Sequence, residues 1–193
     1  MSSVRAITGS ILLLFSLVAP SARAAEKVQY TVQPLAGFEI VEKEIPDLHS
    51  KIRFMYGARI TGGYRQFAGE VEGTRATDRE DFLLQSLSIE DRTDRVKLGI
   101  RSTQNLFGSS RLSITARAGG EASRTQHSQT LNGVSTQNTS PIYCRPYIGG
   151  GVSTEVYRGF ALGFDVVAVI NIHDLRKNDY QGTASIQIPV YSK

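Results

Sequence analysis

The last quarter of the sequence, from Tyr143 to Tyr191, consists largely of three consecutive segments in which apolar residues alternate with polar or small ones. Successive side chains of a β-strand point to opposite faces, so a period of two over ten or more residues predicts long strands. Each strand would carry one apolar face. The function therefore depends on whether that face contacts a protein core or lipid. In the middle segment, the apolar side consists of Phe160, Leu162, Phe164, Val166, Ala168, Ile170 and Ile172.

The first 24 residues have the pattern of a secretory signal peptide. Arg5 precedes an apolar run from Ile11 to Val18, and the small-residue pattern Ala22-Arg23-Ala24 follows. The apolar run is shorter than the roughly 20 residues that a membrane-spanning helix needs. We therefore expect residues 1–24 to be a cleaved signal peptide and residues 25–193 to form one domain.

Turn and charge signals divide this domain into eight candidate strands, and the connections between them alternate between long and short. Thr77–Asp94 and Arg124–Ile142 are expected to be long polar loops, although Asp81–Ile89 could form a short helical turn. Short turns at one end and long loops at the other are typical of bacterial outer-membrane β-barrels. The candidate strands are Val28–Val41, Lys51–Gly63, Gln66–Ala76, Arg95–Thr103, Arg111–Ser123, Tyr143–Tyr157, Gly159–Ile172 and Tyr180–Val190.

The polar faces of these strands carry charges of both signs in equal number. A closed barrel of eight strands has an interior just wide enough for side chains to fill it. Charges are tolerated there only when they are paired and hydrogen-bonded, which an equal count permits. The pattern predicts an all-β fold, an eight-stranded antiparallel up-and-down transmembrane β-barrel with lipid outside and ion pairs inside. The residues expected in this lumen charge network are Glu39, Arg53, Arg59, Glu70, Glu72, Lys97, Arg101, Arg117, Glu121, Arg145, Glu155 and Asp165.

Four stretches of the chain resemble a known family. The sequences YIGGGVSTEV, YRGFALGFDVVAVI, YQGTASIQIPV and MYGARITGGY look like the small outer-membrane β-barrel proteins of the OmpA and OmpX type. The resemblance implies insertion into outer-membrane lipid by the barrel-assembly machinery, which reads an aromatic residue near the C-terminus. Tyr191 would take that place here. The family resemblance also implies a monomer without a cofactor.

Several other functions have little support in the sequence. The net charge of +4 comes without a basic run interleaved with aromatic residues, so nucleic-acid binding is not expected. Cys144 falls on an apolar face and is interpreted as a small hydrophobic residue. The histidines His49, His127 and His173 lie in predicted loops without metal-ligand spacing, so no metal site is expected.

We expect a non-enzymatic outer-membrane protein with a structural or surface-interaction role through its extracellular loops. One alternative is a soluble periplasmic barrel of the lipocalin type, which would bury Phe164 and expose Arg117 to water. A less favoured alternative is an outer-membrane enzyme that modifies lipid A, with His173-Asp174 and the serines of Arg124–Ile142 near the outer rim.

Overall fold

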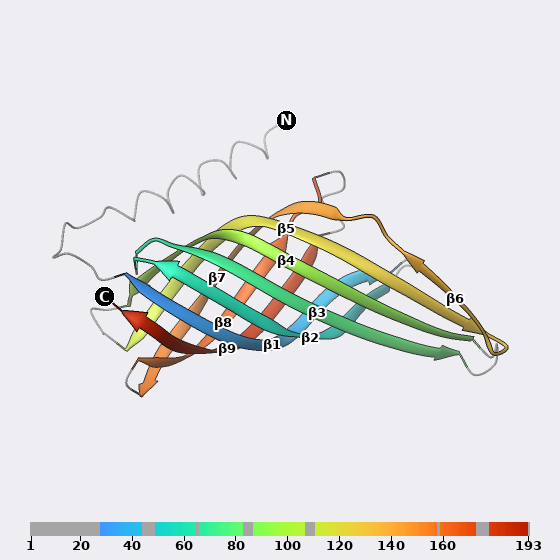
Figure 1. Cartoon of the computed structure of the whole chain (residues 1–193), viewed down its shortest axis with the longest axis horizontal. Helices are drawn as coiled ribbons and strands as arrows, with labels where there is room; N and C mark the ends of the chain where they lie inside the picture. Colours follow the sequence, from blue (N-terminus) through green and yellow to red (C-terminus); the bar gives the residue numbers. More distant parts are fainter. Residues whose placement is uncertain are drawn as a thin grey trace.

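The computed structural model describes residues 28–43, 49–64, 66–82, 87–106, 111–157, 159–172 and 178–192. The predicted signal peptide lies outside these residues. The described part of the chain forms nine β-strands (Figure 1), which are β1 (Gln29–Lys43), β2 (His49–Gly63), β3 (Ala68–Phe82), β4 (Leu87–Asn105), β5 (Leu112–Leu131), β6 (Val134–Thr139), β7 (Tyr143–Tyr157), β8 (Phe160–Val169) and β9 (Asp179–Ser192).

The strands form a closed antiparallel ring. Their order is β4-β3-β2-β1-β9-β8-β7-β5-β6, and an additional pairing of β4 with β5 closes the sheet. Eight strands therefore make the ring, as the alternation predicted. The ninth strand, β6, was not predicted, and it pairs only with the far part of β5 beyond the segment that pairs with β7.

The two segments expected to be long loops are mostly strand, and this prediction was wrong. β3 continues to Phe82 and β4 starts at Leu87, while β5 continues to Leu131 and β6 returns beside it. We call residues 77–82, 87–94, 124–131 and 134–139 the arm, which projects beyond the other strands on the right of Figure 1. The expected helical turn over Asp81–Ile89 is also wrong, because its described residues belong to β3 and β4.

A tight turn ends the β5–β6 hairpin of the arm. Asn132 and Gly133 both have positive φ angles, 51° and 81°. This is the combination that a two-residue type I′ hairpin turn requires, and it explains why Asn-Gly stands at this position. Backbone pairing can thus continue along the arm without an apolar face to support it.

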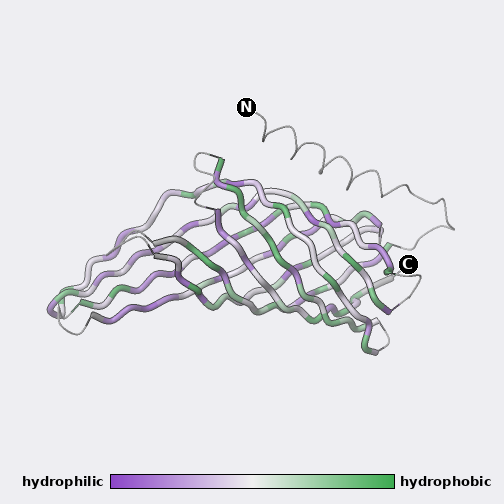
Figure 2. Tube along the Cα trace, turned by 180° about the vertical axis from the view of Figure 1, so that it is seen from behind, coloured by the Kyte–Doolittle hydropathy of each residue, from purple (hydrophilic) through white to green (hydrophobic). Residues whose placement is uncertain are grey.

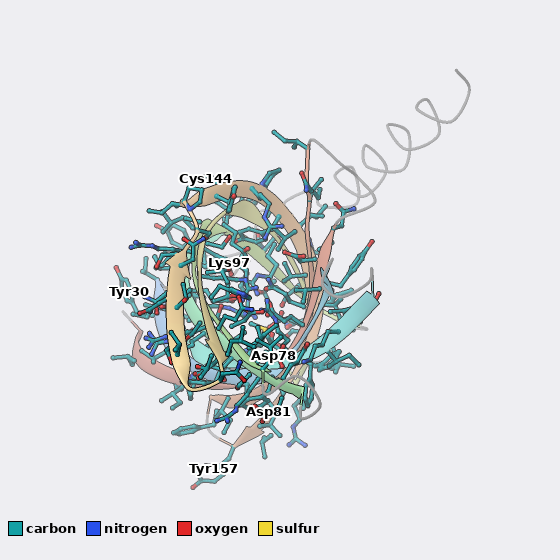
Figure 3. The ribbon with its side chains drawn as sticks, turned by 90° about the vertical axis from the view of Figure 1, so that its right-hand side faces the viewer. Tyr30, Asp78, Asp81, Lys97, Cys144 and Tyr157 are labelled. Atoms are coloured by element: carbon teal, nitrogen blue, oxygen red, sulfur yellow. The ribbon has the colours of Figure 1, made fainter. Side chains whose placement is uncertain are left out.

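The apolar residues of the ring point outward and the charged residues point inward. Phe164 is 53% exposed and Leu98 is 60% exposed, whereas Lys97, next to Leu98 in β4, is 1% exposed. Seen from the end that carries the arm, Lys97 lies inside the ring of strands, and Tyr30 and Tyr157 lie outside (Figure 3). Hydrophobic and hydrophilic residues alternate along the strands in Figure 2. This direction is opposite to that of a soluble lipocalin-type barrel.

None of the described residues belongs to a helix that is long and apolar enough to cross a membrane.

Candidate functional site

The inward-facing side chains of the barrel form a buried cluster of charges. Ten of the twelve residues predicted for the lumen charge network are no more than 7% exposed: Glu39, Arg53, Arg59, Glu70, Glu72, Lys97, Arg101, Arg117, Glu121 and Asp165. They come from six strands of the ring. Within each strand they occupy alternate positions, odd-numbered in five strands and even-numbered in β3, because alternate positions of a regular strand share one face.

Glu72 of β3 is the centre of this cluster. Its carboxylate oxygens lie 2.6 Å from Lys97 Nζ, 2.8 Å from Arg59 Nε and 2.8 Å from an Arg117 terminal nitrogen. Arg59 also reaches Asp165 at 2.8 Å, and Arg117 reaches Glu70 at 2.8 Å. Each buried charge at the centre therefore has at least one partner of opposite sign, as buried charges require.

Glu39 and Glu121 extend the cluster toward the arm. Terminal nitrogens of Arg53 and Arg95 approach the two Glu39 oxygens at 2.6 Å each, as ion pairs rather than well-aligned hydrogen bonds. Arg95 and Lys97 each lie 3.6 Å from Glu121, so the two groups of ion pairs are continuous.

Neutral polar side chains complete the cluster. Gln181 accepts a hydrogen bond from Lys97 Nζ at 2.6 Å and donates one to Glu121 at 3.0 Å. The Tyr147 hydroxyl donates to Glu70 Oε1 at 2.6 Å, and the Arg117 guanidinium carbon lies 5.6 Å from the centre of the Tyr147 ring. These contacts connect the charges into one network across the barrel interior.

Two predicted residues differ from the other ten. Arg145 is partly exposed at the arm end, where it lies 2.6 Å from Asp179 and 3.5 Å from Glu121. Glu155 is exposed and lies outside the network, so including it was wrong. It is close to the end of β7, and its side chain accepts a hydrogen bond from the backbone N–H of Gly159 at 2.9 Å.

Sequence reasoning missed Arg95, Gln33, Gln181, Tyr147 and Asp179. Each of the five lies on the alternate positions of its strand that face inward, so the alternation could have found them. Arg95 was omitted because the preceding segment was assigned to a loop, which made Arg95 a strand end. The neutral residues were omitted because only charges were considered.

The arm has polar contacts of its own. His127 Nδ1 lies 2.5 Å from Asp91 Oδ1, and Lys51 pairs with Asp78 at 2.8 Å and with Glu80. Within the described ranges, no group of three or more histidine, cysteine or acidic side chains is arranged to hold a metal ion. His173 and the side chain of His49 lie outside the described part of the structure.

Comparison with known proteins shows similarity of structure only. No protein-family model matches the chain. No characterised protein matches it in a sequence search.

Two solved structures are similar along nearly their whole length. Neisserial surface protein A (NspA) has a TM-score of 0.54 at 14% identity, covering 82% of this chain and 96% of that one. Ail of Yersinia pestis, in complex with the heparin analogue sucrose octasulfate, has a TM-score of 0.53 at 11% identity, covering 84% and 97%. Both are small eight-stranded outer-membrane barrels. The resemblance seen in the sequence is thus confirmed at the level of the fold, and the chain has the architecture of these barrels.

Proposed function

We propose that this protein is a small, non-enzymatic, monomeric β-barrel of the bacterial outer membrane. Its buried charge network fills the barrel interior, and its arm makes contacts at the cell surface. The observation that carries the proposal is the direction of the two faces. Large apolar side chains such as Ile52, 65% exposed, cover the outside of the ring, while Arg59 and Lys97 are buried within it.

The outer surface supports placement in a membrane. Soluble monomers rarely expose continuous apolar patches larger than a few hundred Å². Here the exposed apolar residues recur on every strand of the ring, for example Phe54 on β2, Leu98 on β4 and Ile148 on β7. A closed ring also satisfies the backbone N–H and C=O groups internally, as a lipid environment demands.

The charge network supports a closed barrel rather than a porin. Barrels of eight strands are filled by side chains, whereas those with 16 or more leave an aqueous channel. Lys97, Arg59 and Arg117 each form an ion pair with Glu72 at the centre of this barrel, so these groups hold the strands together rather than a substrate. A structural role follows for the network.

The arm supports a role in surface contacts. Its outward face carries Arg79, Asp81, Arg92, Asp94 and Arg124 in exposed or partly exposed positions. Such a surface favours a polar partner held by ion pairs and hydrogen bonds. The Ail structure holds a sulfated sugar, and by analogy we propose that the partner of this arm carries charged groups.

The experiment is a heat-modifiability assay combined with membrane fractionation. A barrel folded in detergent should migrate faster on a gel when unheated than when boiled, because the closed sheet resists unfolding by the gel detergent. The expressed protein should remain in the outer-membrane fraction after an alkaline carbonate wash. A protein that stays dispersed and folded in buffer without detergent would contradict the proposal.

A further inference from the structure

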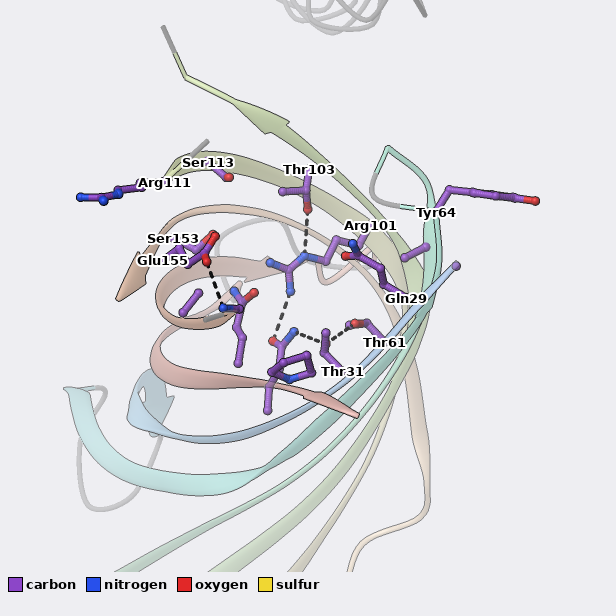
Figure 4. Close-up of a pocket in the computed structure, with 17 residues that line it drawn as sticks. Gln29, Thr31, Thr61, Tyr64, Arg101, Thr103, Arg111, Ser113, Ser153 and Glu155 are labelled. Atoms are coloured by element: carbon purple, nitrogen blue, oxygen red, sulfur yellow. Dashed lines mark hydrogen bonds between the residues drawn. The ribbon is translucent and has the colours of Figure 1, made fainter. Parts of the chain in front are cut away.

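One end of the barrel contains a polar cavity. It has a volume of about 420 Å³ and lies at the end of the short turns, where β1 begins and β9 ends (Figure 4). Among the side chains that line it are those of Thr31, Thr61, Thr103, Ser113 and Ser153, together with Arg101. The lining also includes Arg111 and apolar residues such as Ala161 and Pro189, and the hydroxyls among its side chains suit a small polar ligand or ion.

Arg101 projects into the barrel interior beside this cavity (Figure 4) and is 5% exposed. Its guanidinium donates three hydrogen bonds, and all the acceptors are neutral: Gln33 Oε1 at 3.2 Å, Thr115 Oγ1 at 3.2 Å and Thr103 Oγ1 at 3.3 Å. A guanidinium has five N–H donors, so two remain after these three bonds.

Arg101 differs from the other buried cations in its ion pairing. The side chains of Arg53, Arg59, Arg95, Lys97 and Arg117 each have a carboxylate oxygen within 2.8 Å. In the described part of the chain, no carboxylate oxygen lies within 4.0 Å of the Arg101 nitrogens.

The buried charges of the ring are also unequal in number. Apart from Asp91, which pairs with His127 in the arm, the buried carboxylates of the described residues are Glu39, Glu70, Glu72, Glu121 and Asp165. The six buried cations exceed these five acids by one. A buried charge without a counter-charge is unfavourable, and the cation left over is the one that borders the cavity.

We propose that this cavity binds a small oxyanion, such as sulfate, phosphate or the carboxylate of a small molecule, with Arg101 as its anchor. A planar guanidinium can offer two parallel N–H groups to two oxygens of such an anion. The Thr103 hydroxyl, which lines the cavity, accepts from Arg101, so its own O–H group is free to donate to the anion.

The mouth of the cavity limits what can enter. Glu155 also lines it, and its carboxylate is held at the Gly159 backbone N–H at 2.9 Å. Arg111 also lines the cavity, so the rim has no excess of positive charge that would attract a large polyanion, and the buried cation available to an anion is Arg101. The proposed ligand is therefore small, and it would enter from the end with the short turns.

The test is a titration of the barrel folded in uncharged detergent. Sodium sulfate and sodium phosphate are added in separate series, and sodium chloride at equal ionic strength serves as the reference. Isothermal titration calorimetry measures binding and gel mobility measures the unfolding midpoint. We expect the wild type to bind sulfate or phosphate saturably with a raised midpoint, and Arg101→Gln to bind at least tenfold more weakly.

Arg145→Gln is the matched control, because it also removes an arginine from the barrel but at the opposite end, beside Asp179. It should bind the anions as the wild type does. Equal binding by wild type and Arg101→Gln, or a wild-type response no greater than that to chloride, would overturn the proposal.

A second measurement covers the case in which Arg101→Gln does not fold. In the wild type, the Arg101 Nε–H resonance, assigned by nuclear magnetic resonance, should shift with sulfate concentration along the calorimetric binding curve. A resonance that does not respond to sulfate or phosphate would overturn the proposal as well.

Discussion

The ion pairs of Arg117 stabilise the barrel interior. This arginine lies 2.8 Å from both Glu70 and Glu72, which come from β3, while Arg117 itself comes from β5. Removing one partner of a buried ion pair leaves the other charge uncompensated, which costs about 3–5 kcal/mol. We therefore expect Arg117→Ala and Glu121→Ala to lower the free energy of unfolding in detergent by about this amount, measured by urea unfolding.

Glu155→Ala is the control for these variants, because Glu155 is exposed outside the network. It should change the free energy of unfolding by no more than about 0.5 kcal/mol, as is usual for surface positions. Equal unfolding curves for the wild type, Arg117→Ala and Glu121→Ala would mean that the inward face is hydrated and that the ion pairs add little.

Gly99 makes room for Tyr147 in the same interior. A Cβ atom at position 99 would lie 2.1 Å from the Tyr147 hydroxyl oxygen and 2.5 Å from the Ala118 carbonyl oxygen. We expect Gly99→Ala to displace Tyr147 from Glu70 and to destabilise the barrel by about 1–3 kcal/mol, as overpacking does. Circular dichroism during thermal unfolding would measure the change.

Gly120 gives a matched comparison in the neighbouring strand. A Cβ atom there meets nothing within 4 Å, because Gly120 faces outward. Gly120→Ala should therefore unfold at nearly the wild-type temperature. A loss of stability as large as that of Gly99→Ala would show that chain flexibility, and not the space occupied by Tyr147, explains the effect.

At the scale of elements, the arm differs from the ring in what supports it. The ring strands are paired on both sides, whereas β6 has a single neighbour, β5. Regions with few buried apolar contacts open at low free energy. The Asn132–Gly133 turn is therefore important for keeping the end of the arm paired.

We expect Gly133→Ala to open the end of the β5–β6 hairpin without unfolding the barrel. Gly133 has φ of 81°, and a side chain in this conformation costs about 1–2 kcal/mol. Limited proteolysis should cut the variant faster in residues 126–139, with the unfolding midpoint of the ring unchanged. Gln137→Ala, at an exposed position of β6, is the control and should be cut at the wild-type rate. If Gly133→Ala both increased the rate of proteolysis and lowered the unfolding midpoint of the ring, the arm and the ring would unfold together.

For the whole molecule, a substitution on the apolar exterior can test whether this surface contacts lipid or water. Leu98 is 60% exposed on the outside of the ring. Arginine at a lipid-facing position near the bilayer centre costs about 2–4 kcal/mol. Leu98→Arg should therefore lower the free energy of unfolding from phosphatidylcholine vesicles by about this amount in a urea titration.

Gln137→Arg also introduces an arginine, but at an exposed position of the arm outside the apolar surface. This variant should fold into vesicles as the wild type does. If Leu98→Arg were as stable as Gln137→Arg in the same vesicles, the outside of the ring would not be in contact with acyl chains.

The ring could be predicted from sequence because its strands combine a period of two with apolar residues, as Phe160–Val169 does. The arm could not, because Thr, Ser and Gln occupy both faces of residues 125–130 and leave no apolar period to detect. Asn132-Gly133 was the available signal for that hairpin. The alternation correctly assigned Lys97 and Arg117 to the barrel interior. It also assigned Glu155 there, although Glu155 is exposed beyond the buried part of β7.

From the alternation alone, the strands are expected to be long, with one apolar and one charged face, and a sheet of such strands in lipid must close because open edges would leave backbone groups unpaired. Which charges meet depends on the stagger between strands in the closed ring, because it brings together residues as far apart as Arg59 and Asp165. The same stagger left Arg101 beside a cavity with neutral partners. Local pattern specifies which way a side chain points, and closure of the ring specifies what it contacts.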